Sequence, residues 1–157
     1  EGRAFGSDSL KGKIWVAAFY SLSDSNAAKI TERLLNVNFK YRNRPEISIV
    51  SFSTQPDKDT PEVLRNYTDM MNRYNITASK WQFLTGQPEV LNSFMRNGFL
   101  IENIHQEAIF RLVDHNGQVR GQYGNTEYHM EDLMEDISAI SKRKKVEKFN
   151  EKQKLGD

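Results

Sequence analysis

The polar loop after the first apolar run is the place where this chain could carry chemistry. Residues 15–20 (WVAAFY) predict a buried strand, and residues 21–29 (SLSDSNAAK) follow it as a loop and first helical turn. No cysteine occurs there or anywhere else in the 157 residues. A thiolate is the nucleophile of disulfide exchange and a soft copper ligand, and a hydroxyl, carboxylate or alanine cannot replace it. The sequence therefore excludes disulfides, thiol redox chemistry and thiolate metal sites.

The other polar side chains form no catalytic set. Ser21, Ser23 and Ser25 could suggest a serine nucleophile, but no base lies near them in the sequence and no G-x-S-x-G elbow is present. His115 and His129 have no metal-ligand partner at helical spacing. We therefore predict no catalytic residue and no residue that binds an organic cofactor.

Length and charge narrow the class of protein further. A chain of 157 residues is long enough for one domain with its own core. Its formal net charge of +1 gives no reason to expect a nucleic-acid partner. No stretch approaches the roughly 20 apolar residues of a membrane-spanning helix. Because the sequence begins at Glu1 rather than Met, we expect a missing N-terminal segment that could provide a membrane tether.

Hydrophobic periodicity predicts alternating strands and helices. Strands are expected at about 14–20, 47–52, 81–84, 108–113 and 119–123, and helices at about 26–37, 61–74, 87–97 and 127–141. Thr60 is the expected N-cap of the second helix, and Asn116 with Gly117 indicates a hairpin. A single domain is expected at 1–141, followed by a charged tail at 142–157 that forms a solvated or frayed helical end.

For two helices the sequence predicts further details, namely the cap of the first and the buried side of the third. Asp24 or Ser25 is expected to cap the first helix, because a short side-chain oxygen accepts hydrogen bonds from free N–H groups of the first turn. In the third helix, Val90, Leu91 and Phe94 are expected to face the core.

The order of the elements is typical of an α/β, thioredoxin-like fold. Strands separated by helices pair in parallel at the centre of a mixed sheet, and helices flank both faces. The final hairpin adds an antiparallel edge and is followed by the last helix. This arrangement predicts that the ends of the parallel strands position the loop at residues 21–29.

Several segments of the chain resemble the Sco/SenC family, and together they cover most of residues 10–140. They are residues 11–17 (KGKIWVA), 50–53 (VSFS), 59–64 (DTPEVL), 81–86 (WQFLTG), 112–114 (LVD) and 120–123 (RGQY). The resemblance implies a thioredoxin-fold, copper-handling protein involved in the assembly of cytochrome c oxidase.

The family's copper ligands do not recur in this chain. The family binds copper through a Cys-x-x-x-Cys-Pro loop and a distant histidine. The resemblance aligns the two cysteines with Asp24 and Ala28, the proline with Lys29, and the histidine with Gln106, beside His105. Asp24 and His105 are the remaining candidate metal ligands. One carboxylate and one imidazole could hold Cu(II) or Zn(II) loosely but would not retain Cu(I), so we favour a helix cap for Asp24 and a loop histidine without a role for His105.

The leading hypothesis is a degenerate Sco/SenC-like domain that has lost thiol redox activity and tight Cu(I) binding. It would not be an enzyme, would need no cofactor or small-molecule substrate, and would act by binding a protein partner. The resemblance also implies export and tethering in the cell envelope or periplasm. Two alternatives remain: a metal carrier that uses Asp24 and His105, and a thioredoxin-like oxidoreductase relative, which the missing thiols disfavour.

Overall fold

A mixed β-sheet forms the centre of the computed structural model, which describes residues 7–99 and 109–156. In this part of the chain the strand order is β3-β2-β1-β4-β5. Strands β1, β2 and β3 are parallel, whereas β4 and β5 are antiparallel to their neighbours. The strand bounds are Ile14–Tyr20, Ile47–Ser53, Trp81–Leu84, Ile109–Val113 and Val119–Tyr123. The predicted mixed sheet with its antiparallel hairpin edge is therefore confirmed.

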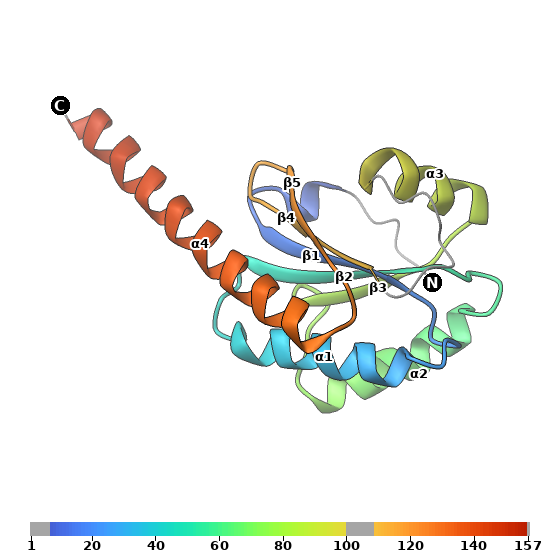
Figure 1. The fold of residues 1–157 in the computed structure, drawn as a ribbon. Helices are drawn as coiled ribbons and strands as arrows, with labels where there is room; N and C mark the ends of the chain where they lie inside the picture. The colour runs from blue at the N-terminus through green and yellow to red at the C-terminus, as the bar shows by residue number, and fades with distance from the viewer. Residues whose placement is uncertain (1–6, 100–108, 157) are drawn as a thin grey trace.

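Helices cover both faces of this sheet (Figure 1). Helices α1 (Ala27–Lys40) and α2 (Pro61–Arg73) lie on one face with the start of α4, and α3 (Pro88–Phe99) lies on the other. A short 3₁₀ helix, η1 (Ser7–Leu10), precedes β1. Thr60 caps α2 as predicted, because its hydroxyl accepts a hydrogen bond from the Val63 N–H.

Strand β1 divides its side chains between the two cores. All seven of its residues are buried, because both faces of a central strand are covered. Alternate residues from Ile14 to Tyr20 pack with α1, α2 and α4, whereas Trp15, Ala17 and Phe19 pack with α3. A continuous apolar run is thus the sequence pattern of a strand buried on both sides.

Three predicted details of the helices are wrong, and the first concerns the cap of α1. Helix α1 begins at Ala27 with Asn26 at the N-cap, so neither Asp24 nor Ser25 caps it. Asp24 instead belongs to the preceding turn, where its carbonyl accepts from the Ala27 N–H at 3.0 Å. Because of this turn, α1 begins at Ala27.

In helix α3 the inward orientation predicted for Leu91 is confirmed, and the orientation predicted for Val90 is wrong. Phe94 lies with its ring centroid 5.2 Å from that of Phe52 but stays partly exposed. The buried residues of α3 are Leu91, Met95 and Phe99, which repeat every four residues. Val90 and Phe94 are 64% and 42% exposed. The helix extends to Phe99, two residues beyond the predicted end, and this additional apolar residue fixes which side of the helix faces the sheet.

Helix α4 (Glu127–Gly156) is much longer than predicted. The predicted end near residue 141 is wrong, because the helix continues through the charged segment to Gly156. Within residues 7–99 and 109–156, none of the helices combines the length and the hydropathy of a membrane-spanning segment.

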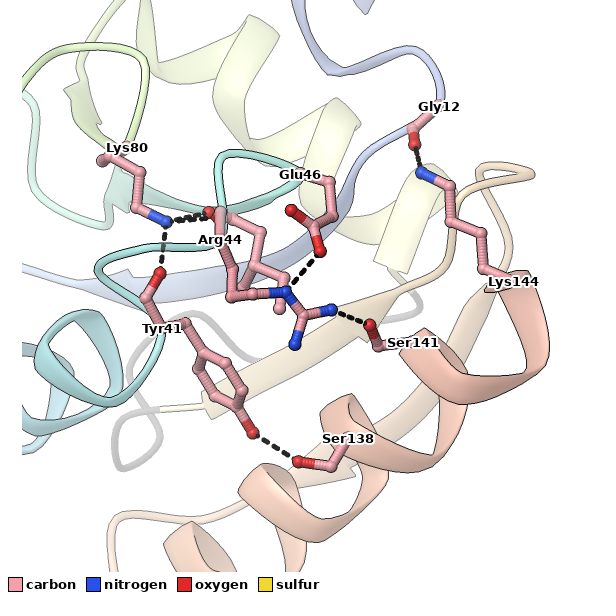
Figure 2. A network of polar contacts seen from close by, with 9 residues as sticks. Gly12, Tyr41, Arg44, Glu46, Lys80, Ser138, Ser141 and Lys144 are labelled. Atoms are coloured by element: carbon pink, nitrogen blue, oxygen red, sulfur yellow. Dashed lines mark hydrogen bonds and ion pairs between the residues drawn. The ribbon is translucent and has the colours of Figure 1, made fainter. Parts of the chain in front are cut away.

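Polar contacts fasten α4 to the end of the sheet where β2 begins (Figure 2). The Tyr41 hydroxyl lies 2.9 Å from Ser138 Oγ and donates to the Met134 carbonyl at 2.8 Å. The Arg44 guanidinium bonds Ser141, and its Nε lies 2.6 Å from Glu46 Oε1. The segment between α1 and β2 therefore anchors α4 to the domain through hydrogen bonds.

Lys80 holds that segment in place. Its ammonium donates to the carbonyls of Tyr41, Arg44 and Ile47 at 2.9, 2.7 and 2.6 Å. Burial lowers the pKa of Lys80, although nearby Glu46 opposes this effect. One cation thus closes the turn between α1 and β2 and joins it to the start of β3.

The β4–β5 hairpin is built around Asp114, whose side chain is buried. Its Oδ1 accepts from the Asn116 and Gln118 N–H groups at 2.9 and 3.0 Å, and its Oδ2 lies 2.5 Å from Arg120 Nε. Gly117 has a φ of 79°, whereas Asn116 does not have a positive φ. The predicted hairpin is confirmed, but the aspartate side chain and a single glycine shape its turn.

We expect the Asp114 carboxylate to make stability depend on acid pH. Burial alone would raise the pKa of this carboxyl, but hydrogen bonds from Gln118, Arg120 and Asn116 outweigh it and lower the pKa. Because the folded-state pKa lies below the unfolded value of about 4, the stabilisation is present above that value and lost as pH falls through the folded pKa.

Asp114→Asn should lower the free energy of unfolding at pH 7 by about 1–2 kcal/mol and flatten its decline in acid. Urea unfolding at a series of pH values measures both effects. Asp69→Asn, at an exposed position on α2, is the matched control. An unchanged acid profile in Asp114→Asn would contradict this role.

Candidate functional site

The candidate site lies where β1 and β2 end. The two strands are parallel and in register, with Tyr20 opposite Ser53, so their following loops emerge side by side. Ligand sites in open α/β sheets lie at the carboxyl ends of such strands. The loop at residues 21–26 and the loop at residues 54–60 therefore form the candidate site.

A buried carboxylate joins these two loops. Asp59 has no exposed surface, and its Oδ1 accepts from the Leu22 N–H at 3.0 Å and from Ser21 Oγ at 3.2 Å. Its Oδ2 accepts from Ser53 Oγ. Both oxygens are thus occupied by internal donors, which offset the cost of burying the charge.

The network extends from Asp59 through the side chains of Ser21, Ser23 and Gln55. Ser21 Oγ lies 2.7 Å from Ser23 Oγ, and Ser23 donates to Gln55 Oε1 at 3.2 Å. The Gln55 N–H donates to Ser53 Oγ at 3.2 Å. Ser21 and Ser23 therefore serve as links between the two loops. Among the described residues, the carboxylate that contacts Ser21 is Asp59, whose oxygens also accept from Leu22 and Ser53.

Sequence reasoning missed Asp59 as the organiser of the site. One signal was present: Asp59 directly precedes the N-cap Thr60 and follows a strand that ends in polar residues. That signal does not identify the donors, since Ser21 and Leu22 are 38 and 37 residues away along the chain.

Among the described residues, the positions that the resemblance aligns with the family's ligands do not form a metal-binding cluster. Asp24 is half-buried, and its Oδ1 accepts from the Asn26 N–H at 3.3 Å. Ala28 is exposed in the first turn of α1. His105 and Gln106 lie outside the described residues, within which no group of three or more His, Asp or Glu side chains gathers. A carboxylate and a methyl group do not fit Cu(I), which prefers sulfur.

Phenolic groups lie buried below the site. Tyr20 Oη is 3.0 Å from Tyr67 Oη, which is 3.1 Å from Thr31 Oγ1. Ser51 Oγ donates to Tyr20 at 3.4 Å and accepts from Trp81 Nε1 at 3.0 Å. Burial, followed by the interaction with Tyr67, raises the pKa of Tyr20 well above its usual value. Burial likewise raises the pKa of Tyr67. Both phenols therefore stay neutral and cannot act as bases near neutral pH.

The two described histidines make structural contacts away from these loops. His129 Nδ1 accepts from the Gly124 N–H at 2.7 Å, next to the start of α4. His115 Nε2 lies 3.0 Å from Glu147 Oε2, which joins the hairpin turn to α4. Neither contributes a ligand to the candidate site.

Comparison with known proteins identifies the scaffold. The family model described as SCO1/SenC matches residues 1–142. The chain belongs to the SCO1/SenC family. This membership explains why the loop after β1 lies where the family's thiols are expected, and it confirms the resemblance and the predicted thioredoxin-like fold.

Individual relatives agree with this assignment. The SCO1 protein homolog of Bacillus subtilis (strain 168) is 27% identical over 156 residues, covering 90% of this chain and 78% of that protein. The crystal structure of a SCO1/SenC family lipoprotein from Bacillus anthracis str. Ames is 28% identical, with a TM-score of 0.70 over 87% of this chain and 86% of that one. Arabidopsis thaliana ScoI with copper bound shares the fold at 16% identity, with a TM-score of 0.66 over 87% and 89%.

We expect Asp59 to be the main source of stability at this site. Asp59→Ala would leave the Leu22 N–H and two serine hydroxyls without their acceptor, at a cost of about 3 kcal/mol in the free energy of unfolding. Urea denaturation measures this loss. Asp57→Ala, at an exposed position in the same loop, is the control and should change stability by less than about 0.5 kcal/mol. Equal losses in the two variants would show that the network does not organise the loops.

Proposed function

We propose that this chain is a degenerate SCO1/SenC domain that has lost thiol redox chemistry and tight Cu(I) binding and acts by binding a protein partner. One observation carries the proposal: the chain contains no cysteine, and the resemblance aligns the family's two cysteines with Asp24 and Ala28. The scaffold has thus kept its shape and replaced both sulfur ligands.

The replacing side chains cannot supply the lost chemistry. Disulfide exchange requires a sulfur nucleophile, and a carboxylate or methyl group cannot form the mixed disulfide. The Asp24 carboxylate accepts from the Asn26 N–H, and its hard oxygen suits Cu(I) poorly. The same absence of thiols removes the oxidoreductase alternative.

A defined surface supports the role as a binding domain. The Asp59 network fixes the loops after β1 and β2 without a metal or a disulfide. On the opposite face of the sheet from α1, helix α3 exposes Val90 and Phe94 four residues apart. Exposed apolar side chains at helical spacing are a common feature of protein-binding surfaces.

Location in the cell envelope is part of the proposal. The related Bacillus anthracis protein is a lipoprotein. We infer the same type of location for this chain, with a tether N-terminal to residue 1. The partner would then be an envelope protein, in keeping with the family's role in assembling cytochrome c oxidase.

A copper titration tests the loss of metal handling. Competition of the purified chain against Cu(I) and Cu(II) chelators should leave no protein-bound copper. The Asp24→Cys/Ala28→Cys variant should gain one equivalent of Cu(I), because it restores two thiols at the family positions. Asn36→Cys/Arg65→Cys, exposed positions on α1 and α2, adds the same number of thiols as a control and should bind less tightly.

One result would favour the metal-carrier hypothesis instead. If the unaltered chain retained one equivalent of copper and His105→Ala abolished it, the site would have kept its function with a changed ligand set that includes Asp24 or His105.

Site-specific crosslinking tests the protein-binding role. A photoreactive phenylalanine analogue in place of Val90 should give one discrete adduct in cells that make the protein, because Val90 lies in the proposed contact surface. The same analogue in place of Lys11, another exposed position, is the control. Identical adduct patterns at the two positions, or none at Val90, would argue against a partner at α3.

A further inference from the structure

The function proposed above assigns no role to the second half of α4. Residues 142–156 continue the helix by about 22 Å at 1.5 Å per residue. Figure 1 shows this end of α4 extending away from the sheet and the other helices. A charged helix that extends away from its domain buries little of its surface against that domain. Its surface is therefore available for an external contact.

One side of this extension faces the domain. The Lys144 ammonium bonds the Gly12 carbonyl (Figure 2), and Glu147 Oε2 lies 3.0 Å from His115 Nε2. Glu151 follows one turn after Glu147 and therefore lies on the same side. Both glutamates of the extension thus lie on the side of the helix that is turned toward the domain.

The opposite side is apolar and cationic. Val146 and Phe149 are 58% and 62% exposed and are three residues apart. Lys142, Lys145 and Lys152 are three or four residues from one of these two and therefore lie beside them. This side, which we call the outer face, carries lysines around two exposed apolar side chains and no acid.

Charge is concentrated in this segment. Residues 142–157 contain seven of the chain's 22 lysines and arginines but three of its 21 acidic residues. The near-neutral net charge of the whole chain conceals this asymmetry. Such a positive segment complements an anionic surface.

We propose that the outer face of α4 docks on an anionic lipid surface. Lysine heads attract lipid phosphates electrostatically, while Val146 and Phe149 enter the headgroup boundary, which is the behaviour of a basic amphipathic helix. A straight, projecting helix with a diffuse lysine charge suits a flat and fluid surface. The inference is independent of whether the domain binds copper.

Vesicle sedimentation with the full chain tests the proposal. The protein should bind vesicles in which about one third of the lipid is phosphatidylglycerol, bind phosphatidylcholine vesicles at least tenfold more weakly, and dissociate in about 0.5 M salt. Lys142→Glu/Lys145→Glu/Lys152→Glu should reduce binding at least tenfold, since each lysine near the surface contributes about 1 kcal/mol. Lys11→Glu/Lys58→Glu/Arg65→Glu makes the same change in net charge at exposed positions elsewhere and should retain most of the binding.

A label on each side of the helix tests the orientation. Because the chain has no cysteine, Gln153→Cys on the outer face and Glu151→Cys on the domain side can each carry one environment-sensitive fluorophore. Anionic vesicles should shift the emission of the Gln153→Cys label to the blue and leave the Glu151→Cys label unchanged. Circular dichroism establishes that each variant is folded.

Three results would overturn the proposal. They are equal binding to neutral and anionic vesicles, equal loss in the two triple variants, and equal shifts of the two labels. Absence of any vesicle binding would also overturn it.

Discussion

The buried carboxylate of Asp59 is the constraint on which the site end of this domain depends. A charge without solvent exposure is tolerated only when donors surround it, and here the donors come from the loop after β1 and from the end of β2. The start of α2 is fixed by the same group, because Asp59 directly precedes its N-cap. One side chain therefore sets the relative positions of three segments.

The other end of the sheet uses the same physical solution with the opposite charge. The Lys80 ammonium is surrounded by three carbonyls from the connection between α1 and β2. That connection also supplies Tyr41 and Arg44, which bond α4 (Figure 2). A charged group thus joins the segments at each end of the sheet, the buried Asp59 at one end and the half-buried Lys80 at the other, and the partners of both are backbone groups and hydroxyls.

These internal contacts explain how a SCO1/SenC domain can keep its fold without thiols. The two apolar cores on either side of β1 provide the burial, and the polar network provides the loop geometry. Neither requires a ligand or a disulfide at positions 24 and 28. Fold and chemistry are therefore separable in this domain, because the chemistry depends on a few side chains grafted on a loop.

Local patterns and composition were enough to predict the strands, the order of the elements and the absence of thiol chemistry. β1 and β3 were predicted with their observed bounds because apolar runs and alternation are local signals. The missing cysteines exclude thiolate ligands in any fold, so the loss of thiol chemistry from the loop also followed from composition.

Long-range contacts determine which residues organise the site and which sides of the helices are exposed. Asp59 meets Ser21 across 38 residues because β1 and β2 pair in parallel, and no local pattern encodes that distance. The rotation of α3 depends on Phe99 packing against the sheet, and the exposure of Val146 depends on where α4 leaves the domain. Local periodicity shows that a helix has two sides, whereas long-range packing decides which one is buried.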